Sequence, residues 1–115
     1  MLYFVSTPIG NLKDISYRAV EVLSLVDVIA CEDTRISLKL LNRYDIKKRL
    51  VAYHKFNEKT ECEKIIAMIE DGLNVAVISD AGTPLVSDPG NALAKELHAR
   101  GIAYTVVPGA TAFTS

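Results

Sequence analysis

The sequence is poor in cysteine and has no excess of charge of either sign. Cys31 and Cys62 are its only cysteines, and neither has a second cysteine or a histidine at metal-ligand spacing. Because both lie in apolar periodic runs, we expect them to be small core residues rather than metal ligands. Thirteen basic and fourteen acidic residues give a net charge of -1, which excludes a globally basic nucleic-acid binder and an acidic tail protein.

Long hydrophobic runs are also absent. No window approaches the roughly 18 consecutive apolar residues that a membrane-spanning helix needs, and the apolar residues 1–5 are too few for the core of a secretion signal. We therefore expect a cytoplasmic protein that does not enter a membrane. With 50% hydrophobic and 23% charged residues over 115 positions, the composition is that of one ordinary folded domain.

Short apolar runs rich in Val and Ile alternate with helical patterns along the whole chain. The runs cover residues 2–6, 26–31, 50–53, 73–79 and 103–107. Their near-continuous hydrophobicity is typical of strands that are buried on both faces, as in a parallel sheet. The sequence therefore predicts an α/β fold, in which a five-stranded, mostly parallel, doubly wound sheet carries helices on both faces.

Capping signals bound the four predicted helices. The third is the clearest, because Thr60 and Glu63 have the spacing of a capping box. Glycines that could end the third and fourth helices follow their apolar stripes at Gly72 and Gly101. The residues expected to cap the amino ends of the four helices are Asp14, Thr34, Thr60 and Asp88. The residues expected on the buried side of the second helix are Ile36, Leu40 and Tyr44.

Loops of small and turn-forming residues follow three of the predicted strands. These loops are Ser6–Asn11, Ser79–Pro84 and Pro108–Ala112. If the strands are parallel, all three loops lie at one edge of the sheet, where exposed backbone groups and small side chains let a flat nucleoside approach. Any one of them could be an ordinary turn, but three together favour a binding site. Asp80 directly follows a predicted strand, where it could accept from a ribose hydroxyl or an adenine amino group or, equally well, cap the loop at Gly82.

The usual nucleotide signatures are missing from these loops. No G-x-G-x-x-G follows the first predicted strand, and no G-x-x-x-x-G-K-[ST] occurs anywhere. Both absences argue against the common dinucleotide and nucleoside triphosphate folds.

The segment Glu32-Asp33-Thr34-Arg35 has the chemistry of a substrate site. Arg35 can pair with a phosphate, and a carboxylate can accept from a ribose hydroxyl or take a proton, for which Asp33 is the candidate. The alternative is that Asp33 or Thr34 caps the next helix while Glu32 and Arg35 are solvated.

Positive charge is concentrated in the middle of the chain. From Thr34 to Lys64 there are nine basic and four acidic residues, a local net charge of +5 that the rest of the chain offsets with -6. Four cations surround the third predicted strand: Lys47, Lys48, Arg49 and Lys55. Such clustering is expected for a protein that binds a polyanion, although it is also compatible with a solvated face.

Four motifs, in this order, resemble those of the tetrapyrrole methylase superfamily, and in particular its ribosomal RNA methyltransferases. They are Ser6–Leu12, Glu32–Arg35, Ser79–Pro84 with Ser87–Gly90, and Val107–Ala110. The resemblance covers the whole chain. It implies a class III methyltransferase that uses S-adenosylmethionine as methyl donor and needs no metal.

The resemblance also implies a domain organisation and a site. Residues 1–115 would be the N-terminal α/β methyltransferase domain, inactive alone, with a C-terminal domain absent from this chain and the cofactor between the two. Carried onto this sequence, the cofactor-binding residues are Pro8, Gly10, Asp80, Gly82, Thr83, Gly109, Thr111 and Ala112. The substrate-binding residues are Glu32, Arg35 and Lys55, with Asp33 as the catalytic candidate.

The implied reaction is 2'-O-methylation of a cytidine in 16S ribosomal RNA, with that RNA or the small ribosomal subunit as partner. Two alternatives stay open: a methyltransferase that acts on a tetrapyrrole carbon, and a non-catalytic nucleotide-binding module. The Glu32–Arg35 segment and the basic middle of the chain favour RNA. The sequence does not identify the general base or the target nucleotide, and it does not decide between a monomer and a homodimer.

Overall fold

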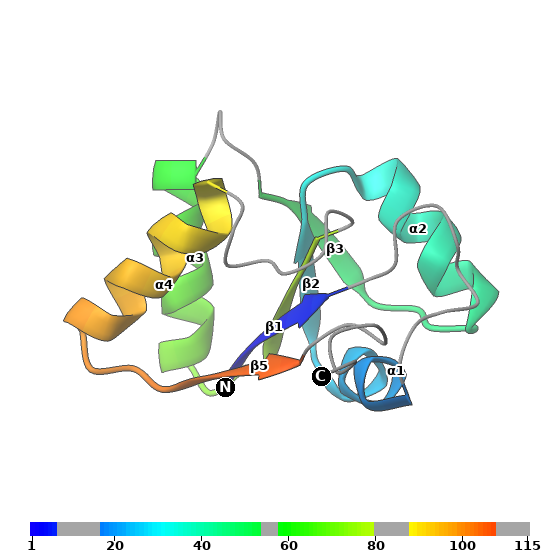
Figure 1. Cartoon of the computed structure of the whole chain (residues 1–115), viewed down its shortest axis with the longest axis horizontal. Coiled ribbons are helices and arrows are strands. Elements are labelled where there is room, and N and C mark those ends of the chain that lie inside the picture. The colour runs from blue at the N-terminus through cyan, green and yellow to red at the C-terminus, as the bar shows by residue number, and fades with distance from the viewer. Residues whose placement is uncertain (7–16, 54–57, 80–87, 108–115) are drawn as a thin grey trace, which may run out of the picture.

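Five strands alternate with four helices in the computed structural model, which describes residues 1–6, 17–53, 58–79 and 88–107 (Figure 1). The elements are β1 (Leu2–Ser6), α1 (Tyr17–Leu25), β2 (Val28–Cys31), α2 (Thr34–Arg43), β3 (Arg49–Ala52), α3 (Glu58–Glu70), β4 (Val75–Ser79), α4 (Asp88–Ala99) and β5 (Tyr104–Val107). The alternation predicted from the apolar runs is confirmed.

The strands form one sheet in the order β3-β2-β4-β1-β5. Every neighbouring pair is parallel, so each connection between consecutive strands must cross over through a helix. Along the chain, the path runs outward from β1 to β2 and β3, returns to β4 between β2 and β1, and then crosses to β5 on the far side of β1. This is the doubly wound, parallel arrangement that the sequence predicts.

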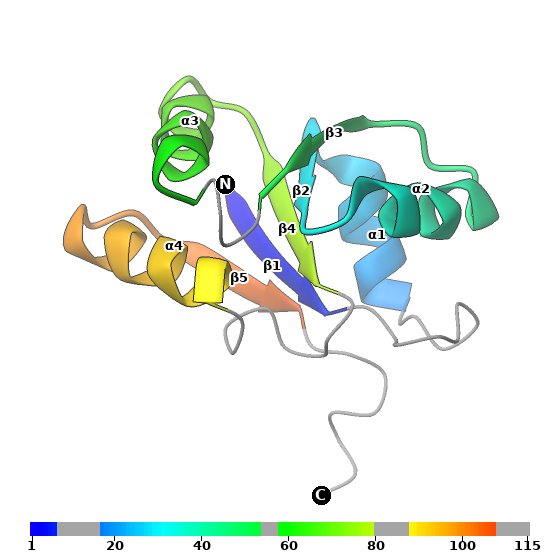
Figure 2. The same ribbon diagram turned by 90° about the horizontal axis from the view of Figure 1, so that it is seen from above.

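Helices cover both faces of the sheet, as the view from above shows most directly (Figure 2). α1 and α2 pack on one face, where Val5 and Ile78 contribute to the core. α3 and α4 pack on the other, where Phe4 and Val77 point. The connections from β1 to β2 and from β2 to β3 cross the first face, and those from β3 to β4 and from β4 to β5 cross the second. Crossovers of a single hand require this change of face when the path reverses.

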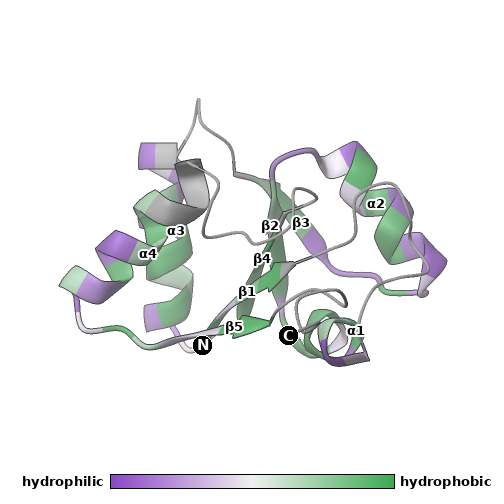
Figure 3. Cartoon of the chain, in the orientation of Figure 1, coloured by the Kyte–Doolittle hydropathy of each residue, from purple (hydrophilic) through white to green (hydrophobic). Residues whose placement is uncertain are grey.

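Burial on both faces explains why the strands read as continuous apolar runs. Successive side chains of β1 alternate between the two cores, so neither set of positions meets water. Figure 3 shows the green, hydrophobic strands at the centre and the purple, hydrophilic residues on the helices and on the segment that leads into β3. Cys31 is buried in the α1/α2 core, as expected, whereas Cys62 is half-buried against the α3/α4 core.

The amino end of α2 differs from the prediction by one residue. Asp33, not Thr34, is the N-cap: its backbone is extended, with φ -124° and ψ 109°, and its carboxylate accepts from the Arg35 backbone N–H. Ile36 is 46% exposed rather than buried. The physical reason is that Leu40 and Leu41 both face the sheet. The residue one turn before them on the same side of the helix is Ser37, which is buried, so Ile36 lies outside.

The other predicted amino-terminal caps have three outcomes. α3 begins at Glu58, so Thr60 lies within its first turn and the predicted capping box is wrong. Asp88 is the first residue of α4, one position inside the predicted cap, a difference within the ordinary uncertainty of helix ends. Asp14 lies outside the described residues.

The carboxyl ends of α3 and α4 share one hydrogen-bonding pattern. In α3, Gly72 N–H donates to Ile69 C=O and Leu73 N–H donates to Met68 C=O, both at 3.0 Å. Gly72 has φ +91° and Gly101, at the equivalent place after α4, has φ +69°. These are Schellman motifs, which need a left-handed residue after the last turn. The predicted helix-ending glycines are confirmed.

α2 ends in the same motif without a glycine. Asp45 N–H donates to Asn42 C=O at 3.2 Å and Ile46 N–H donates to Leu41 C=O at 2.9 Å. Asp45 has φ +55°, a conformation in which a side chain is sterically disfavoured although aspartate tolerates it better than most residues. The buried Ile46 then continues into β3.

Candidate functional site

The five strands end nearly level at the carboxyl edge of the sheet. Ser6 at the end of β1 pairs with Ser79 at the end of β4. Val107 pairs with Val5, one residue before the end of β1. On the other side of β4, Cys31 pairs with Ile78 and places the end of β2 in the same row. The segments that follow the strands therefore start side by side.

The order of the strands fixes the order of these segments along the edge. Reading across the sheet, the chain leaves the strands towards residues 54–57, 32–33, 80–87, 7–16 and 108–115. The last three contain the predicted cofactor residues, and they follow β4, β1 and β5, which are direct neighbours. The first two follow the neighbouring pair β3 and β2 and contain the predicted substrate residues Lys55 and Glu32, while Arg35 lies just beyond, in the first turn of α2. Sequence order alone does not give this grouping.

The connection that leaves β4 lies on the opposite face of the sheet from those that leave its two neighbours. The chain leaves β4 towards α4 on one face of the sheet, whereas it leaves both neighbours, β1 and β2, towards α1 and α2 on the other face. In open α/β sheets, ligands bind beyond the carboxyl ends of the strands at such a switch point. The described topology therefore has such switch points between β4 and each of its two neighbours, and another between β3 and β2.

Most of the predicted site residues lie outside the described part of the chain. This applies to Pro8, Gly10, Lys55, Asp80, Gly82, Thr83, Gly109, Thr111 and Ala112. What the structure describes is where the strands that lead to them end. Of the predicted residues, Glu32, Asp33 and Arg35 are described in full.

Asp33 and Arg35 contact each other at the amino end of α2. The Arg35 backbone N–H donates to Asp33 Oδ1 at 2.9 Å, and Arg35 Nε lies 3.7 Å from the same oxygen. The Asp33 side chain is 39% exposed and that of Arg35 is 91% exposed, and Glu32 is exposed as well. The alternative in which Asp33 caps the helix is confirmed. Its role as a proton acceptor stays a prediction, and both described contacts use Oδ1, not Oδ2.

The amino end of α2 carries charge of both signs, because the Asp33 carboxylate caps it beside the exposed Arg35 side chain. The positive end of the α2 dipole and the extended Arg35 guanidinium lie together beside the end of β2. The 3.7 Å contact between Arg35 and Asp33 is exposed and weak. Arg35 can therefore pair with a phosphate without first breaking a buried ion pair.

The cations before β3 lie at the opposite edge. Arg49 is the first residue of β3 and pairs with Val28, the first residue of β2. Lys47 is exposed and Lys48 half-buried, just before that end of the strand. These cations therefore lie at the amino edge, away from the strand ends that lead to the candidate cofactor segments.

Within the described ranges, no group of three or more His, Cys, Asp or Glu residues is arranged to hold a metal ion. None of the helices in that same part of the chain is both long and apolar enough to cross a membrane.

Comparison with known proteins identifies a family and close relatives. The sequence model of the tetrapyrrole (corrin/porphyrin) methylases matches residues 1–115. A protein of Mycoplasmopsis pulmonis named ribosomal RNA small subunit methyltransferase I is 53% identical over 113 residues, covering 98% of this chain and 51% of the relative. A protein of the same name from Mesorhizobium japonicum is 53% identical over 111 residues, covering 96% of this chain and 38% of the relative.

Solved structures show the same fold at lower identity. The crystal structure of uroporphyrin-III-C-methyltransferase from Thermus thermophilus superposes with a TM-score of 0.74 at 25% identity, over 94% of this chain and 46% of that protein. The chain thus spans about half, or less, of the length of the proteins it matches.

Proposed function

The chain belongs to the tetrapyrrole methylase family, and from this premise we propose that it is the N-terminal domain of a methyltransferase for small-subunit ribosomal RNA. The observation that carries the proposal is the identity of 53% to proteins named for that activity, over nearly the whole chain. That the chain covers only 38% to 51% of those relatives supports a second domain, which would complete the site.

The methyl donor of the proposed reaction is S-adenosylmethionine, which supplies an activated methyl group on a sulfonium. The described topology fits such a ligand, because β4, β1 and β5 are neighbours and the segments of small residues begin at their level ends. Backbone groups of these segments would bind the nucleoside. The residues concerned are Pro8, Gly10, Asp80, Gly82, Thr83, Gly109, Thr111 and Ala112.

The acceptor proposed is the 2'-hydroxyl of a cytidine in 16S ribosomal RNA. In the balanced reaction the bond from sulfur to methyl breaks, the bond from methyl to the ribose oxygen forms, and the hydroxyl proton goes to a base. Asp33 would take this proton through Oδ2, because Oδ1 already accepts from the Arg35 backbone. Glu32, Arg35 and Lys55 would hold the RNA, with Arg35 paired to a phosphate.

Methylation of a tetrapyrrole carbon is the second candidate. The likeness of the fold to a uroporphyrin-III-C-methyltransferase favours it. The identity to that protein is 25%, against 53% to the ribosomal RNA methyltransferases, and the exposed Arg35 beside the helix dipole suits a phosphodiester chain. RNA is therefore the better supported substrate.

A methyl-transfer assay with the complete enzyme separates the candidates. Labelled S-adenosylmethionine is offered with small ribosomal subunits, with naked 16S RNA and, separately, with a uroporphyrinoid. We expect label in the RNA, at a cytidine whose 3' phosphodiester resists alkaline cleavage because its 2'-oxygen is blocked. Label in the porphyrinoid alone would overturn the proposal. Label in RNA on a base would leave RNA as substrate but contradict the 2'-oxygen.

Binding of the donor to the 115-residue chain tests the domain proposal. We expect weak binding by calorimetry, because the second wall of the site belongs to the absent domain. Micromolar or tighter binding by a monomer of this chain would show that the site lies within it. If the binding species is a homodimer, the second copy supplies the wall. The reaction and its partner also suit a cytoplasmic enzyme.

A further inference from the structure

α2 presents a regular row of cations to solvent. Arg35, Lys39 and Arg43 follow one another at intervals of four residues, and all three are exposed. Residues four apart in an α-helix lie on one face, about 6 Å apart along the axis. The buried residues Ser37, Leu40 and Leu41 occupy the opposite face. The row therefore lies at the centre of the outer surface of the helix.

One more cation follows in the turn that leads from α2 to β3. Ile46 N–H donates to Leu41 C=O, which holds the chain against the last turn of the helix. Lys47 follows directly and is exposed. We call Arg35, Lys39, Arg43 and Lys47 the cationic face.

The cationic face differs from Arg18, Lys64 and Arg100 in having few acidic partners. Arg18, Lys64 and Arg100 all form ion pairs with glutamates at 2.6 to 3.3 Å. Within the part of the chain that the structure describes, Lys39, Arg43 and Lys47 form none, and Arg35 has only the 3.7 Å contact with Asp33. Three adjacent cations without an internal partner are suited to an external anion.

The direction of α2 connects the cationic face to the candidate site. α2 begins where β2 ends, at the carboxyl edge, and delivers the chain to the start of β3, at the amino edge (Figure 1). The cationic face therefore runs from the candidate substrate residue Arg35 to the basic residues Lys47 and Lys48. On either side of it, Ile36 and Leu38 are 46% and 50% exposed, which provides apolar surface beside the charges.

We propose that the cationic face binds the sugar-phosphate backbone of the RNA substrate and leads it along α2 to the carboxyl edge of the sheet. The inference rests on the proposed function for the class of polyanion. It adds a binding surface on the flank of the domain, outside the cofactor segments. Cations in a row contact successive phosphates, and the exposed side chains of Ile36 and Leu38 contact unpaired bases or sugars.

The test uses two variants of the complete enzyme that each lose three positive charges. The first carries Lys39→Gln, Arg43→Gln and Lys47→Gln, and leaves Arg35 in place. The matched control carries Gln at the three exposed positions Arg18, Lys64 and Lys95, on α1, α3 and α4. Affinity for 16S RNA is measured between about 50 and 200 mM salt, a range over which phosphate contacts change affinity strongly. Donor affinity and melting temperature are measured beside it.

We expect the first variant to bind RNA on the order of tenfold more weakly at low salt, with the slope of log K against log salt reduced by about 2. Its KM for RNA rises while kcat, donor affinity and melting temperature stay near the parental values. The control keeps the parental slope within about half a unit.

Three outcomes would overturn the proposal. An equal loss in both variants would mean that only net charge matters. An unchanged slope in the first variant, with RNA methylation intact, would show that the cationic face does not bind the RNA, without contradicting the proposed function. Unchanged binding of naked RNA, with weaker binding of the small subunit, would assign the face to an acidic ribosomal protein. Absence of RNA methylation by the parental enzyme would contradict the proposed function itself.

Discussion

Glycines follow helices at the amino edge of the sheet and strands at its carboxyl edge, and we propose different reasons for them. At the amino edge, Gly72 and Gly101 end α3 and α4 with positive φ. A Cβ built on either of them has no atom within 4 Å, so space is not the reason for glycine there. At the carboxyl edge, the segments after β1, β4 and β5 contain Gly10, Gly82 and Gly109, where the proposed reason is close approach of a ligand to the backbone. If the proposed site is right, one residue type serves conformation at one edge and binding at the other.

The difference teaches how to separate structural from functional positions in this fold. Substitutions at the amino edge change how a helix returns to a strand, and their cost appears as stability. Substitutions at the carboxyl edge change what can lie over the strand ends, and their cost appears as ligand affinity. A substitution at one edge should therefore lower either stability or ligand affinity, and not both.

The largest effect is expected for Gly82→Val in the complete enzyme. If the donor lies against the backbone after β4, two added methyl groups block it, and we expect its affinity to fall at least on the order of a hundredfold, about 3 kcal/mol. The melting temperature should change little. Asp80→Ala should also weaken donor binding, by removal of a hydrogen-bond acceptor. Calorimetry and thermal unfolding measure the two quantities.

Unfolding of the Gly82→Val protein would break the comparison. It would show that Gly82, like Gly72, is needed for a positive-φ turn, and that its conformation rather than ligand approach selects glycine.

The next largest effect is expected for Gly72→Val at the amino edge. A β-branched residue at φ +91° is strongly disfavoured, and we expect a loss of about 1 to 2 kcal/mol in the free energy of unfolding. Donor affinity should not change. Gly72→Asn is the matched control, because asparagine tolerates the left-handed conformation and should cost less. Equal losses for valine and asparagine in urea unfolding would contradict the conformational explanation.

Much of this comparison could be predicted from the sequence, because local patterns report local structure. The helix-ending glycines and all five strands were identifiable, although the second and fourth strands start two residues later than their apolar runs. Val26 and Leu73 extend those runs for another reason: each follows a helix end and bonds back to it, Val26 to Val22 and Leu73 to Met68. Val26 is fully buried, which explains its hydrophobicity without strand pairing, and Leu73 is half-buried.

What the sequence could not provide are the features that depend on distant elements. The neighbours of β4 in the sheet are β2 and β1, from far earlier in the chain, and this order alone groups the candidate cofactor segments. The choice between Asp33 and Thr34 as cap, and the exposure of Ile36, depend on how α2 is rotated on the sheet. A helical periodicity fixes the apolar stripe only to within about one residue.

Asp45 offers a further test of the comparison, because it has the positive φ that glycine has after α3 and α4. Asp45→Gly should relieve the side-chain strain at φ +55° and stabilise the protein by up to about 1 kcal/mol in urea unfolding. Asp45→Ala removes the charge but keeps a Cβ, so it should not stabilise. If both substitutions stabilise equally, repulsion or solvation of the carboxylate is responsible rather than the backbone.

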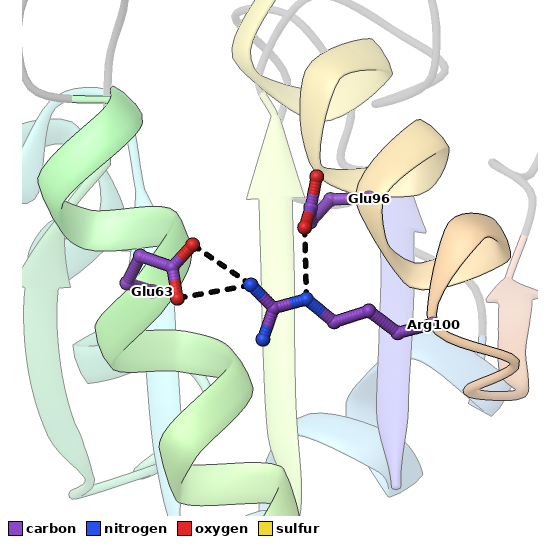
Figure 4. A network of polar contacts seen from close by, with 3 residues as sticks. All are labelled: Glu63, Glu96 and Arg100. Carbon is purple, nitrogen blue, oxygen red and sulfur yellow. Dashed lines mark hydrogen bonds and ion pairs between the residues drawn. The ribbon is translucent and has the colours of Figure 1, made fainter.

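A third feature of the amino edge is an ion-pair network between α3 and α4 (Figure 4). Arg100 follows the end of α4 and its Nη2 donates to both oxygens of Glu63 on α3, at 2.9 and 3.1 Å, while its Nε donates to Glu96 at 2.8 Å. Hydrogen bonds to Glu96 and then Glu63 raise the pKa of the Arg100 guanidinium above its ordinary value. The guanidinium therefore stays charged, and the stability linked to this shift is lost as the pH rises through the raised pKa.

The smallest effect is expected for Arg100→Gln, which removes this link while keeping most of the side-chain stem. Exposed ion pairs contribute little, so the melting temperature should fall by less than in Gly72→Val, and donor affinity at the opposite edge should not change. Because salt screens exposed charges, the difference from the parental protein should shrink between about 0.05 and 1 M salt. A difference that persists at high salt would mean that the stem of Arg100 packs across α3 and α4 instead. A change in donor affinity would show that the position of α4 couples the two edges, and the separation drawn from the glycines would then fail.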